Sequence, residues 1–447
     1  MLQPGRVNFI LDFYYGSSGK GQVATAIAKK YRPEVLTANH ATSASHTIID
    51  EDNNINFVFK ALPTASILNR TEKDYNPTII IPASSVFEIH QLIKEITYCK
   101  LSKEQVIIHP RSIVLTSKHS EAEAGEGGTI HLGSTMSGQS YAVSEKITRR
   151  PDTKLADHYR SILEQYATIP PDTEFFPIYF MDAIMENKTI FCEMPQGFPL
   201  SIDHGPKYPY STFRNIVPSQ FMADIGISPD HIGSIIGNIR SFPIRVSNRY
   251  INNDISEVKL RVKAGGIEEW VSPDSMNMDY SAINAITYDL ITKGSVEYNG
   301  YTIMDIEGVV GLSGPFEDDM KEISWKQLSK KLGKEVTELT TLTKLTRRIA
   351  TMRDSDMSIS HKMLEKFLIS VNPTHFSVTF ANYIDPSLEG ATTIDEINNS
   401  SLLRNWAVNA LVDIQTVYTK YQASPIPKIG IIQVGKDLKN VIFLQGE

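Results

Sequence analysis

Near its start the chain reads Val7-Asn8-Phe9-Ile10-Leu11-Asp12-Phe13-Tyr14-Tyr15-Gly16-Ser17-Ser18-Gly19-Lys20-Gly21-Gln22. The apolar run at 7–13 predicts a buried strand. Residues 23–30 have apolar side chains at helical spacing and end in two lysines, which predicts a helix. A strand, a glycine-rich turn and a helix together place backbone N–H groups and the positive end of a helix around a phosphate. We therefore predict that a phosphate is bound by Gly16, Ser18, Gly19, Lys20, Gly21 and Gln22.

An ordinary tight turn between strand and helix is the alternative interpretation of this loop. The common phosphate-loop pattern GxxxxGK[ST] is not met, because Tyr14 stands at the first glycine position and Gly21 at the hydroxyl position. The residues of the loop alone favour phosphate binding only slightly.

The composition is typical of a globular protein, with 41% hydrophobic and 21% charged residues among 447. This length allows several domains or one large α/β domain. A formal charge of −7 argues against a broad nucleic-acid-binding surface. Cys99 and Cys192 form neither a disulfide framework nor a zinc motif. No apolar run has the ~20 residues that span a bilayer, and the first strand leaves no room for a signal peptide. We expect a cytoplasmic enzyme or binding protein without nucleic-acid or membrane partners.

Strand and helix patterns alternate along most of the chain. Apolar runs predict strands at 34–37, 57–59, 78–81, 106–109, 189–193, 376–380 and 428–434. Helical spacing predicts helices at 86–97, 363–371 and 402–421. This alternation predicts an α/β fold with a mainly parallel central sheet flanked by helices. Residues 119–140 are polar and glycine-rich, which predicts a long functional loop.

Two polar segments are candidates for a site. Residues 39–47 contain His40 and His46 with four hydroxyl residues, and Gln196 and Asp203-His204 follow the predicted strand 189–193. Loops at the carboxyl ends of parallel strands build the ligand sites of such sheets. Exposed loop histidines are the simpler interpretation, and Asp203-His204 has no matching nucleophile motif.

The character of the sequence changes at residues 249–310. Charge-alternating strands and a helical stretch at 281–291 predict a self-contained insertion within a single domain that spans 1–447. It closes near Ser313-Gly314.

In their order, these motifs resemble those of the adenylosuccinate synthetase family. Gly16–Gln22 resembles the family's GDEGKGK, 43–47 its NAGHT, Gly133-Ser134-Thr135 its phosphate-binding threonine loop, and 145–150 the segment with its dimer-crossing arginine. The segments 196–210, Arg245-Val246-Ser247 and 343–348 are similar to its QGxxLDIDHGTYPY, RVG and TGRxRR motifs. The resemblance covers nearly the whole chain except 249–310, and it implies the P-loop-like fold of this family.

The resemblance also implies a reaction and a set of roles. In the family, a nucleoside triphosphate phosphorylates the purine O6, and L-aspartate then displaces that phosphate. His46 would act as the acid at O6, and Lys20 with the loop would hold the donor phosphates with Mg²⁺, for which Ser17 and Ser45 are the expected ligands. The resemblance also implies contacts with the three substrates. The nucleotide substrate would be contacted by Ser17, Ser43, Ser134, Thr135, Thr212, Gln196, Arg245, Val246 and, in a homodimer, the Arg149 of a second subunit. Aspartate would be contacted by Thr343 and Arg347, and the phosphate donor by Thr47, Asn382, Asp385 and Gly435.

Ser17 is the main departure from the family, which has a catalytic aspartate there. A serine hydroxyl is a poor base without help, but it is smaller than aspartate and leaves room for an amino group at purine C2. This resembles the viral branch of the family, which acts on dGMP on the route to 2-aminoadenine DNA. Asn382 stands where the family reads guanine with an aspartate, and its amide also suits adenine. Leu345 replaces an arginine near the ribose, which mildly favours a deoxynucleotide.

The sequence therefore predicts a ligase that joins L-aspartate to dGMP with ATP or dATP. An ordinary synthetase that uses IMP and GTP is one alternative. A nucleotide-binding homologue without activity is the other, and Ser17 is the residue that keeps it open.

Overall fold

A nine-stranded sheet forms the centre of the computed structural model, which describes residues 1–40, 45–125, 129–134, 136–340, 344–421 and 425–444. The strand order is β22-β21-β20-β10-β1-β9-β2-β5-β7. Every neighbouring pair is parallel except β21 and β22. The predicted mainly parallel sheet is confirmed, and its strands are β1 Val7–Asp12, β2 Val35–Thr37, β5 Thr78–Ile81, β7 Val106–Ile108, β9 Ile190–Gly197, β10 Ile232–Arg240, β20 His375–Thr379, β21 Lys428–Gln433 and β22 Val441–Phe443.

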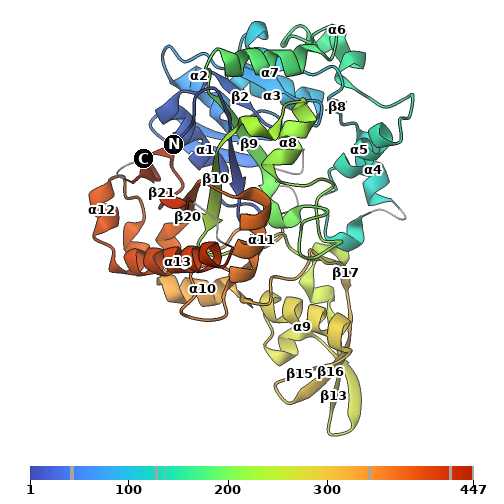
Figure 1. Ribbon diagram of the computed structural model, residues 1–447. Coiled ribbons are helices and arrows are strands. Elements are labelled where there is room, and N and C mark those ends of the chain that lie inside the picture. Colours follow the sequence, from blue (N-terminus) through green and yellow to red (C-terminus); the bar gives the residue numbers. More distant parts are fainter. Residues whose placement is uncertain (41–44, 126–128, 135, 341–343, 422–424, 445–447) are drawn as a thin grey trace.

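Helices cover both faces of this sheet (Figure 1). The α-helices are α1 Lys20–Tyr31, α2 Leu68–Thr71, α3 Ile89–Tyr98, α4 Ser117–Ala124, α5 Gln139–Ile147, α6 Arg160–Leu163, α7 Phe175–Met185, α8 Pro218–Ile225, α9 Tyr280–Lys293, α10 Trp325–Leu332, α11 His361–Val371, α12 Ile394–Asn398 and α13 Ser401–Lys420. None of those in the described part of the chain is long and apolar enough to pass through a bilayer.

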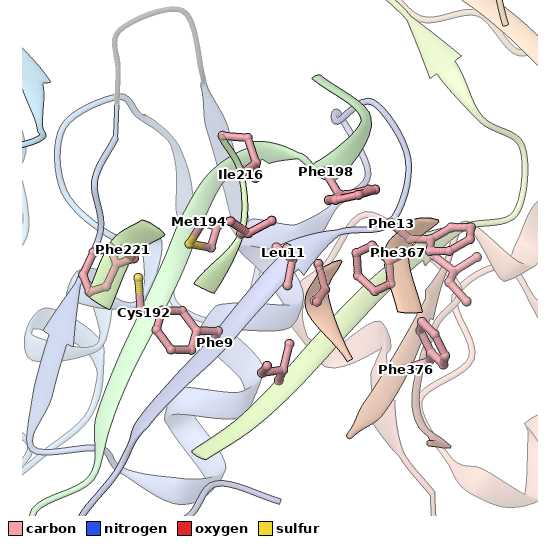
Figure 2. Close-up of a cluster of buried hydrophobic side chains, with 14 of the residues drawn as sticks. Phe9, Leu11, Phe13, Cys192, Met194, Phe198, Ile216, Phe221, Phe367 and Phe376 are labelled. Atoms are coloured by element: carbon pink, nitrogen blue, oxygen red, sulfur yellow. The ribbon is translucent and has the colours of Figure 1, made fainter. Parts of the chain in front are cut away.

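The side chains of β1 alternate between two hydrophobic cores, as expected for a strand buried on both faces. Phe9 and Leu11 belong to the first core, which includes residues of α7, α8, α11 and α13. Figure 2 shows this core, with Phe221 of α8 and Phe367 of α11 close to the side chains of β1 and β9. Ile10 belongs to the second core, together with residues of α1 and α3. The end of β1 is therefore held firmly from both sides.

Residues 249–311 form a smaller unit that extends away from the central sheet (yellow in Figure 1). It contains the sheet β14-β13-β16-β15, helix α9 and a hydrophobic core of its own, which includes Leu260, Ile283 and Ile303. Its strands are β12 Arg249–Tyr250, β13 Lys259–Ala264, β14 Ile267–Val271, β15 Val296–Tyr298, β16 Tyr301–Glu307 and β17 Val309–Gly311. We call these residues the projecting subdomain; that it is atypical for the family stays a prediction.

Two local predictions were wrong, and one predicted strand lies outside the central sheet. Residues 86–97 are not one helix, because β6 (Val86–Phe87) comes first and the Glu88 carboxylate then caps α3. The predicted loop 119–140 begins within α4 and ends within α5, which starts after Gly138 in a left-handed conformation. The predicted strand 57–59 is confirmed as part of β4 (Ile55–Phe59), but it lies outside the central sheet, because β4 pairs with β3 (His46–Asp50) in a separate hairpin.

The remaining strands are short. β6 pairs with β8 (Ile113–Val114), and a three-stranded sheet is formed by β11 (Ile244–Arg245), β19 (Arg348–Met352) and β18 (Met320–Ile323).

Candidate active site

The loop between β1 and α1 is a tight turn that depends on small residues. Gly16, Ser17 and Gly19 have φ angles of 123°, 48° and 75°. A side chain at Gly19 would meet the Gln433 amide, because an added Cβ would lie 2.6 Å from Gln433 Oε1. Ser17 is exposed, whereas Ser18 and Lys20 are buried. The loop therefore presents the Ser17 position to the outside and keeps Lys20 beneath it.

Four ionisable side chains form a chain of contacts below this loop. Lys20 Nζ lies 3.2 Å from Asp12 Oδ2 and 3.3 Å from His46 Nε2. His46 Nδ1 contacts Glu193 Oε1. Asp12 and Glu193 are 2% exposed. Two buried carboxylates thus flank the Lys20 ammonium and the His46 imidazole.

Glu193 orients His46. Its second oxygen, Oε2, accepts hydrogen bonds from Thr64 N and Thr64 Oγ1, both at 2.8 Å. Burial alone raises the pKa of Glu193, but the contact with His46 outweighs this and holds the pKa well below its ordinary value. An ionised Glu193 fixes the proton of His46 on Nδ1 and stabilises the imidazolium. Nε2, 3.2 Å from the Pro195 carbonyl, is then the nitrogen that can exchange a proton with a ligand.

His40 lies beside His46, with 4.8 Å between the ring centroids. Burial lowers the pKa of His40 to about 3, and the neighbouring His46 acts in the same direction. His40 is therefore neutral at physiological pH and cannot compete with His46 for a proton.

Arg240, at the end of β10, joins the loop to its surroundings. Its Nη1 donates to the Ser17 carbonyl at 2.6 Å, and its Nη2 contacts the Glu338 carboxylate. The guanidinium also lies 3.6 Å from the centroid of the Phe380 ring. Arg240 is 1% exposed, so its charge is committed to these neighbours.

The structure brings Gln196 to the same place. Gln196 lies in β9, and the next residue, Gly197, pairs with Asp12 of β1. A Cβ on Gly197 would lie 1.6 Å from the Tyr14 carbonyl oxygen, so only glycine permits this approach. Ser17, Lys20, His46 and Gln196 are thus gathered at the carboxyl ends of β1 and β9.

Other predicted site residues have different partners. Arg245 is buried over the Tyr15 ring, 4.2 Å from its centroid, and donates from Nε to the Ser313 carbonyl at 3.0 Å. The Val246 carbonyl accepts from Ser313 Oγ, and the Ser134 hydroxyl contacts Glu123. Thr212 N donates to the Leu200 carbonyl. Arg149 is exposed just beyond α5.

The residues predicted to bind the donor lie near the ends of β3, β20 and β21. Gln22 Nε2 donates to the carbonyls of Ile49 and Lys436, and therefore ties α1 to β3 and to the residues after Gly435. Asn382 Nδ2 donates to Glu389 Oε2 at 2.5 Å. Asp385 accepts from Ser387 N and Ser400 Oγ, which is a structural capping role in this state. Thr47 is exposed in β3, and Ser45 precedes that strand. Three further predicted residues, Ser43, Thr135 and Thr343, lie outside the described residues.

Sequence reasoning assigned no role to Asp12, Glu193 or Arg240. Asp12 and Glu193 could have been recognised as acidic residues inside apolar strands. Such residues are almost never fully buried unless they are paired. Arg240 had no comparable signal, because its partners come from segments distant in sequence.

The donor atoms of this region suit a magnesium ion only in part. Among the described residues, one group of three potential metal ligands has its atoms within 4.8 Å of one another, namely His40, His46 and Glu193. Two imidazoles and an adjacent Lys20 do not suit Mg²⁺, which prefers oxygen ligands. Ser17 and Asp12 at the loop offer oxygen, so an ion held chiefly by phosphate oxygens fits there.

Comparison with known proteins identifies the family. The family model described as adenylosuccinate synthetase matches residues 9–167 and 152–269. The chain belongs to the adenylosuccinate synthetase family. The second match extends to residue 269, which lies within the projecting subdomain.

Two relatives come from phages and are named N6-succino-2-amino-2'-deoxyadenylate synthase. The protein of Vibrio phage phiVC8 is 26% identical over 389 residues, covering 85% of this chain and 87% of the relative. That of Salmonella phage PMBT28 is 27% identical over 408 residues, covering 89% and 90%.

A solved structure with the same fold is the Cyanophage S-2L succinoaminodeoxyadenylate synthetase bound to dGMP and dATP as an energy donor. The TM-score is 0.67 at 24% identity, and the match covers 98% of this chain and 95% of that protein. The predicted adenylosuccinate synthetase fold is confirmed.

Proposed function

We propose that the protein is a ligase that joins L-aspartate to C6 of dGMP, with ATP or dATP as the phosphate donor. The products are N6-succino-2-amino-2'-deoxyadenylate, ADP or dADP, and phosphate. The observation that carries this proposal is the exposed Ser17 in the loop that also contains Lys20, whose Nζ lies 3.3 Å from His46 Nε2. The names of the two phage relatives and the ligands of the cyanophage protein support it.

Ser17 favours a purine that carries an amino group at C2. A serine is smaller than aspartate and bears no charge, so it leaves room at the N1–C2 edge of the base. Its hydroxyl oxygen can also accept a hydrogen bond from an exocyclic amino group.

The donor triphosphate would bind at the loop from Gly16 to Gln22. Backbone N–H groups at the start of α1 and the Lys20 ammonium supply positive charge for its phosphates. Ser17 and Ser45 would hold Mg²⁺ together with phosphate oxygens. The ion, when bound, neutralises charge on the phosphates. The Asn382 amide offers both a donor and an acceptor, which suits the adenine of ATP or dATP.

His46 would act on O6 of the base. Its Nδ1 is held by Glu193, so its Nε2 can carry a proton toward the oxygen where negative charge develops. Lys20, 3.3 Å from Nε2, adds a second positive charge at this point. Gln196 would contact the base.

The remaining contacts would position the substrates. Arg347 and Thr343 would bind the aspartate carboxylates, a role that suits a planar guanidinium. Thr135, Thr212 and the Arg149 of a second subunit would bind the 5'-phosphate, and Ser43, Ser134, Arg245 and Val246 would contact the rest of the nucleotide. We therefore propose a homodimer.

One set of reactions tests the proposal. Purified protein is incubated with aspartate, Mg²⁺, one donor (ATP, dATP or GTP) and one acceptor (dGMP, GMP or IMP), and succino-nucleotides are measured by mass spectrometry. We expect product from dGMP with ATP or dATP. Product only from IMP would indicate an ordinary synthetase, and no product from any pair would indicate a binding protein without activity.

A further inference from the structure

Helix α9 of the projecting subdomain makes buried hydrogen bonds with the main body. The Tyr288 hydroxyl accepts from Gly314 N at 2.6 Å and from Arg348 Nη1 at 3.2 Å, and it donates to Asn248 Oδ1 at 3.2 Å. A hydroxyl has one donor and two acceptor positions, so these three hydrogen bonds satisfy it completely. The Arg348 guanidinium also lies 4.9 Å from the centroid of the Tyr288 ring.

Asn284, one turn earlier in α9, binds the same region with both ends of its amide. Its Oδ1 accepts from Asn248 Nδ2 at 2.7 Å, and its Nδ2 donates to Glu322 Oε1 at 3.1 Å. Glu322 accepts from Arg348 Nε at 2.9 Å and from Arg348 Nη2 at 2.6 Å, and the Arg348 and Glu322 side chains are 1% and 9% exposed. A buried ion pair is stable only when hydrogen bonds satisfy its remaining donors and acceptors. Helix α9 supplies one such partner to Arg348 and one to Glu322.

Arg348 lies between two segments that are proposed to bind substrates. It begins β19 directly after Arg347, and it is the cross-strand partner of Arg245 in β11. Its Nη1 donates to Ser313 Oγ at 3.1 Å. The Ser313 hydroxyl donates to the Val246 carbonyl at 2.7 Å, and the Ser313 carbonyl accepts from Arg245 Nε at 3.0 Å. No more than one residue therefore separates Arg348 from each of the two segments.

We propose that Tyr288 and Asn284 are positioning residues for the aspartate and dGMP sites. This inference rests on the proposed function, in which Arg347 binds aspartate and residues 245–246 contact dGMP. By fixing Arg348, the two side chains of α9 hold strands β11 and β19 in the arrangement that places these groups. A misplacement of about 1 Å can cost an enzyme about 100-fold in rate, so contacts remote from the substrates can still determine how well they bind. The projecting subdomain is thus a support for two of the three substrate sites.

The donor site provides a reference within the same molecule. The hydrogen bonds named above do not reach the loop from Gly16 to Gln22, which is proposed to bind the triphosphate. Loss of the α9 contacts should therefore weaken the binding of aspartate and dGMP but not that of ATP. General destabilisation would instead reduce the amount of folded enzyme, which lowers the apparent kcat and leaves all three KM values unchanged.

Steady-state kinetics of Tyr288→Phe test this assignment. Phenylalanine keeps the ring beside Arg348 and removes only the hydroxyl. We expect the KM values for aspartate and for dGMP each to rise at least about fivefold, with the KM for ATP within about twofold of the wild type. Asn284→Ala should raise the same two KM values, because it leaves Glu322 and Asn248 each without one partner.

Two other variants of the projecting subdomain are the controls. Ile283→Val removes one methylene from the core of the subdomain and lies in the same helix as Tyr288. Tyr298→Phe removes a hydroxyl from β15. Both should keep all three KM values within about twofold of the wild type. Urea denaturation of each variant measures its stability, so that loss of stability and loss of substrate binding are separated.

A rise of less than about fivefold in either the aspartate or the dGMP KM of Tyr288→Phe would overturn the assignment. A rise of more than about twofold in its KM for ATP, or in any KM of Ile283→Val, would also overturn it and indicate a structural role. If the wild type forms no succino-nucleotide from any pair of donor and acceptor, the proposed function itself fails, and the positioning role fails with it.

Discussion

At the scale of single residues, the site consists of charges that the fold buries in pairs. Two such pairs are nearly inaccessible to water, namely Asp12 with Lys20 and Glu193 with His46. Removing one partner of a buried pair leaves an uncompensated charge, which costs far more than an exposed ion pair contributes. Each of these residues is therefore tied to the protonation state of its neighbour.

Glu193→Gln should impair catalysis more than binding. The amide keeps the shape of the side chain but cannot stabilise a protonated His46, so we expect kcat to fall by roughly 100-fold with little change in KM for dGMP. Steady-state kinetics measure both values. A variant with normal kcat would show that the contact between Glu193 and His46 is structural only.

His40 should make the fold sensitive to mild acid. Its pKa is lowered to about 3 in the folded protein, mainly by burial, whereas an unfolded histidine has a pKa of about 6.5. As the pH falls from about 6.5 toward 3, the unfolded state binds a proton that the folded state does not bind. The free energy of unfolding therefore decreases by up to about 1.4 kcal/mol per pH unit, and above this range His40 has no effect.

Urea denaturation at several pH values measures this slope. His40→Asn should lose less stability between about pH 6.5 and 5 than the wild type does. His90→Asn is the matched control, because His90 is exposed and its slope should equal that of the wild type. Equal slopes in all three proteins would contradict a buried neutral His40.

Sequence reasoning found the residues of the site that lie in recognisable motifs. Ser17, Lys20, His46 and Gln196 were predicted, and the structure gathers them at one edge of the sheet. Glu193 and Asp12 were seen only as members of strands, because the contacts that define them join positions more than a hundred residues apart or depend on the shape of the loop.

At the scale of elements, the loop before α1 depends on backbone conformations that only glycine adopts without strain. Strands with continuous apolar runs were predictable because both faces of the sheet are covered. The structure of residues 86–97 and 119–140 was not predictable in the same way, because side-chain caps at Glu88 and Thr116 determine where helices α3 and α4 begin.

Gly19→Ala tests the loop. Alanine at a φ of 75° is strained by about 1 kcal/mol, and its Cβ would also press on Gln433. We expect ATP to bind at least about tenfold more weakly, as measured by calorimetry. Gly333→Ala is the control, because Gly333 has a φ of 67° but no atom within 4 Å of the added Cβ. Equal ATP affinity in both variants would contradict a phosphate site at Gly19.

At the scale of the whole molecule, two large cores cover the central sheet, a smaller one packs on β20, β21 and β22, and another lies in the projecting subdomain. That subdomain is joined to the main body through buried polar contacts of α9. The Tyr288 hydroxyl accepts from Gly314 N at 2.6 Å, and Asn284 Oδ1 accepts from Asn248 Nδ2 at 2.7 Å. The core of the projecting subdomain was predictable from its apolar positions, but the polar contacts of α9 were not.

Subunit mixing tests the proposed homodimer. If Arg149 completes the site of its partner, neither Arg149→Ala nor His46→Ala should be active alone, but their mixture should regain activity. Random exchange gives half mixed dimers with one complete site each, and thus about a quarter of wild-type activity. A mixture of Arg150→Ala and His46→Ala serves as control, and it should gain nothing beyond the activity of the Arg150→Ala protein. A failure of Arg149→Ala and His46→Ala to complement after confirmed exchange would contradict a shared site.

The most direct test of the central claim is a competition between two acceptors. The protein is given equal concentrations of dGMP and IMP with ATP, aspartate and Mg²⁺, and the two succino-products are measured by mass spectrometry in one sample. Their ratio equals the ratio of the two kcat/KM values. We expect the product of dGMP to exceed that of IMP by at least about 100-fold. A product mixture dominated by adenylosuccinate would contradict it.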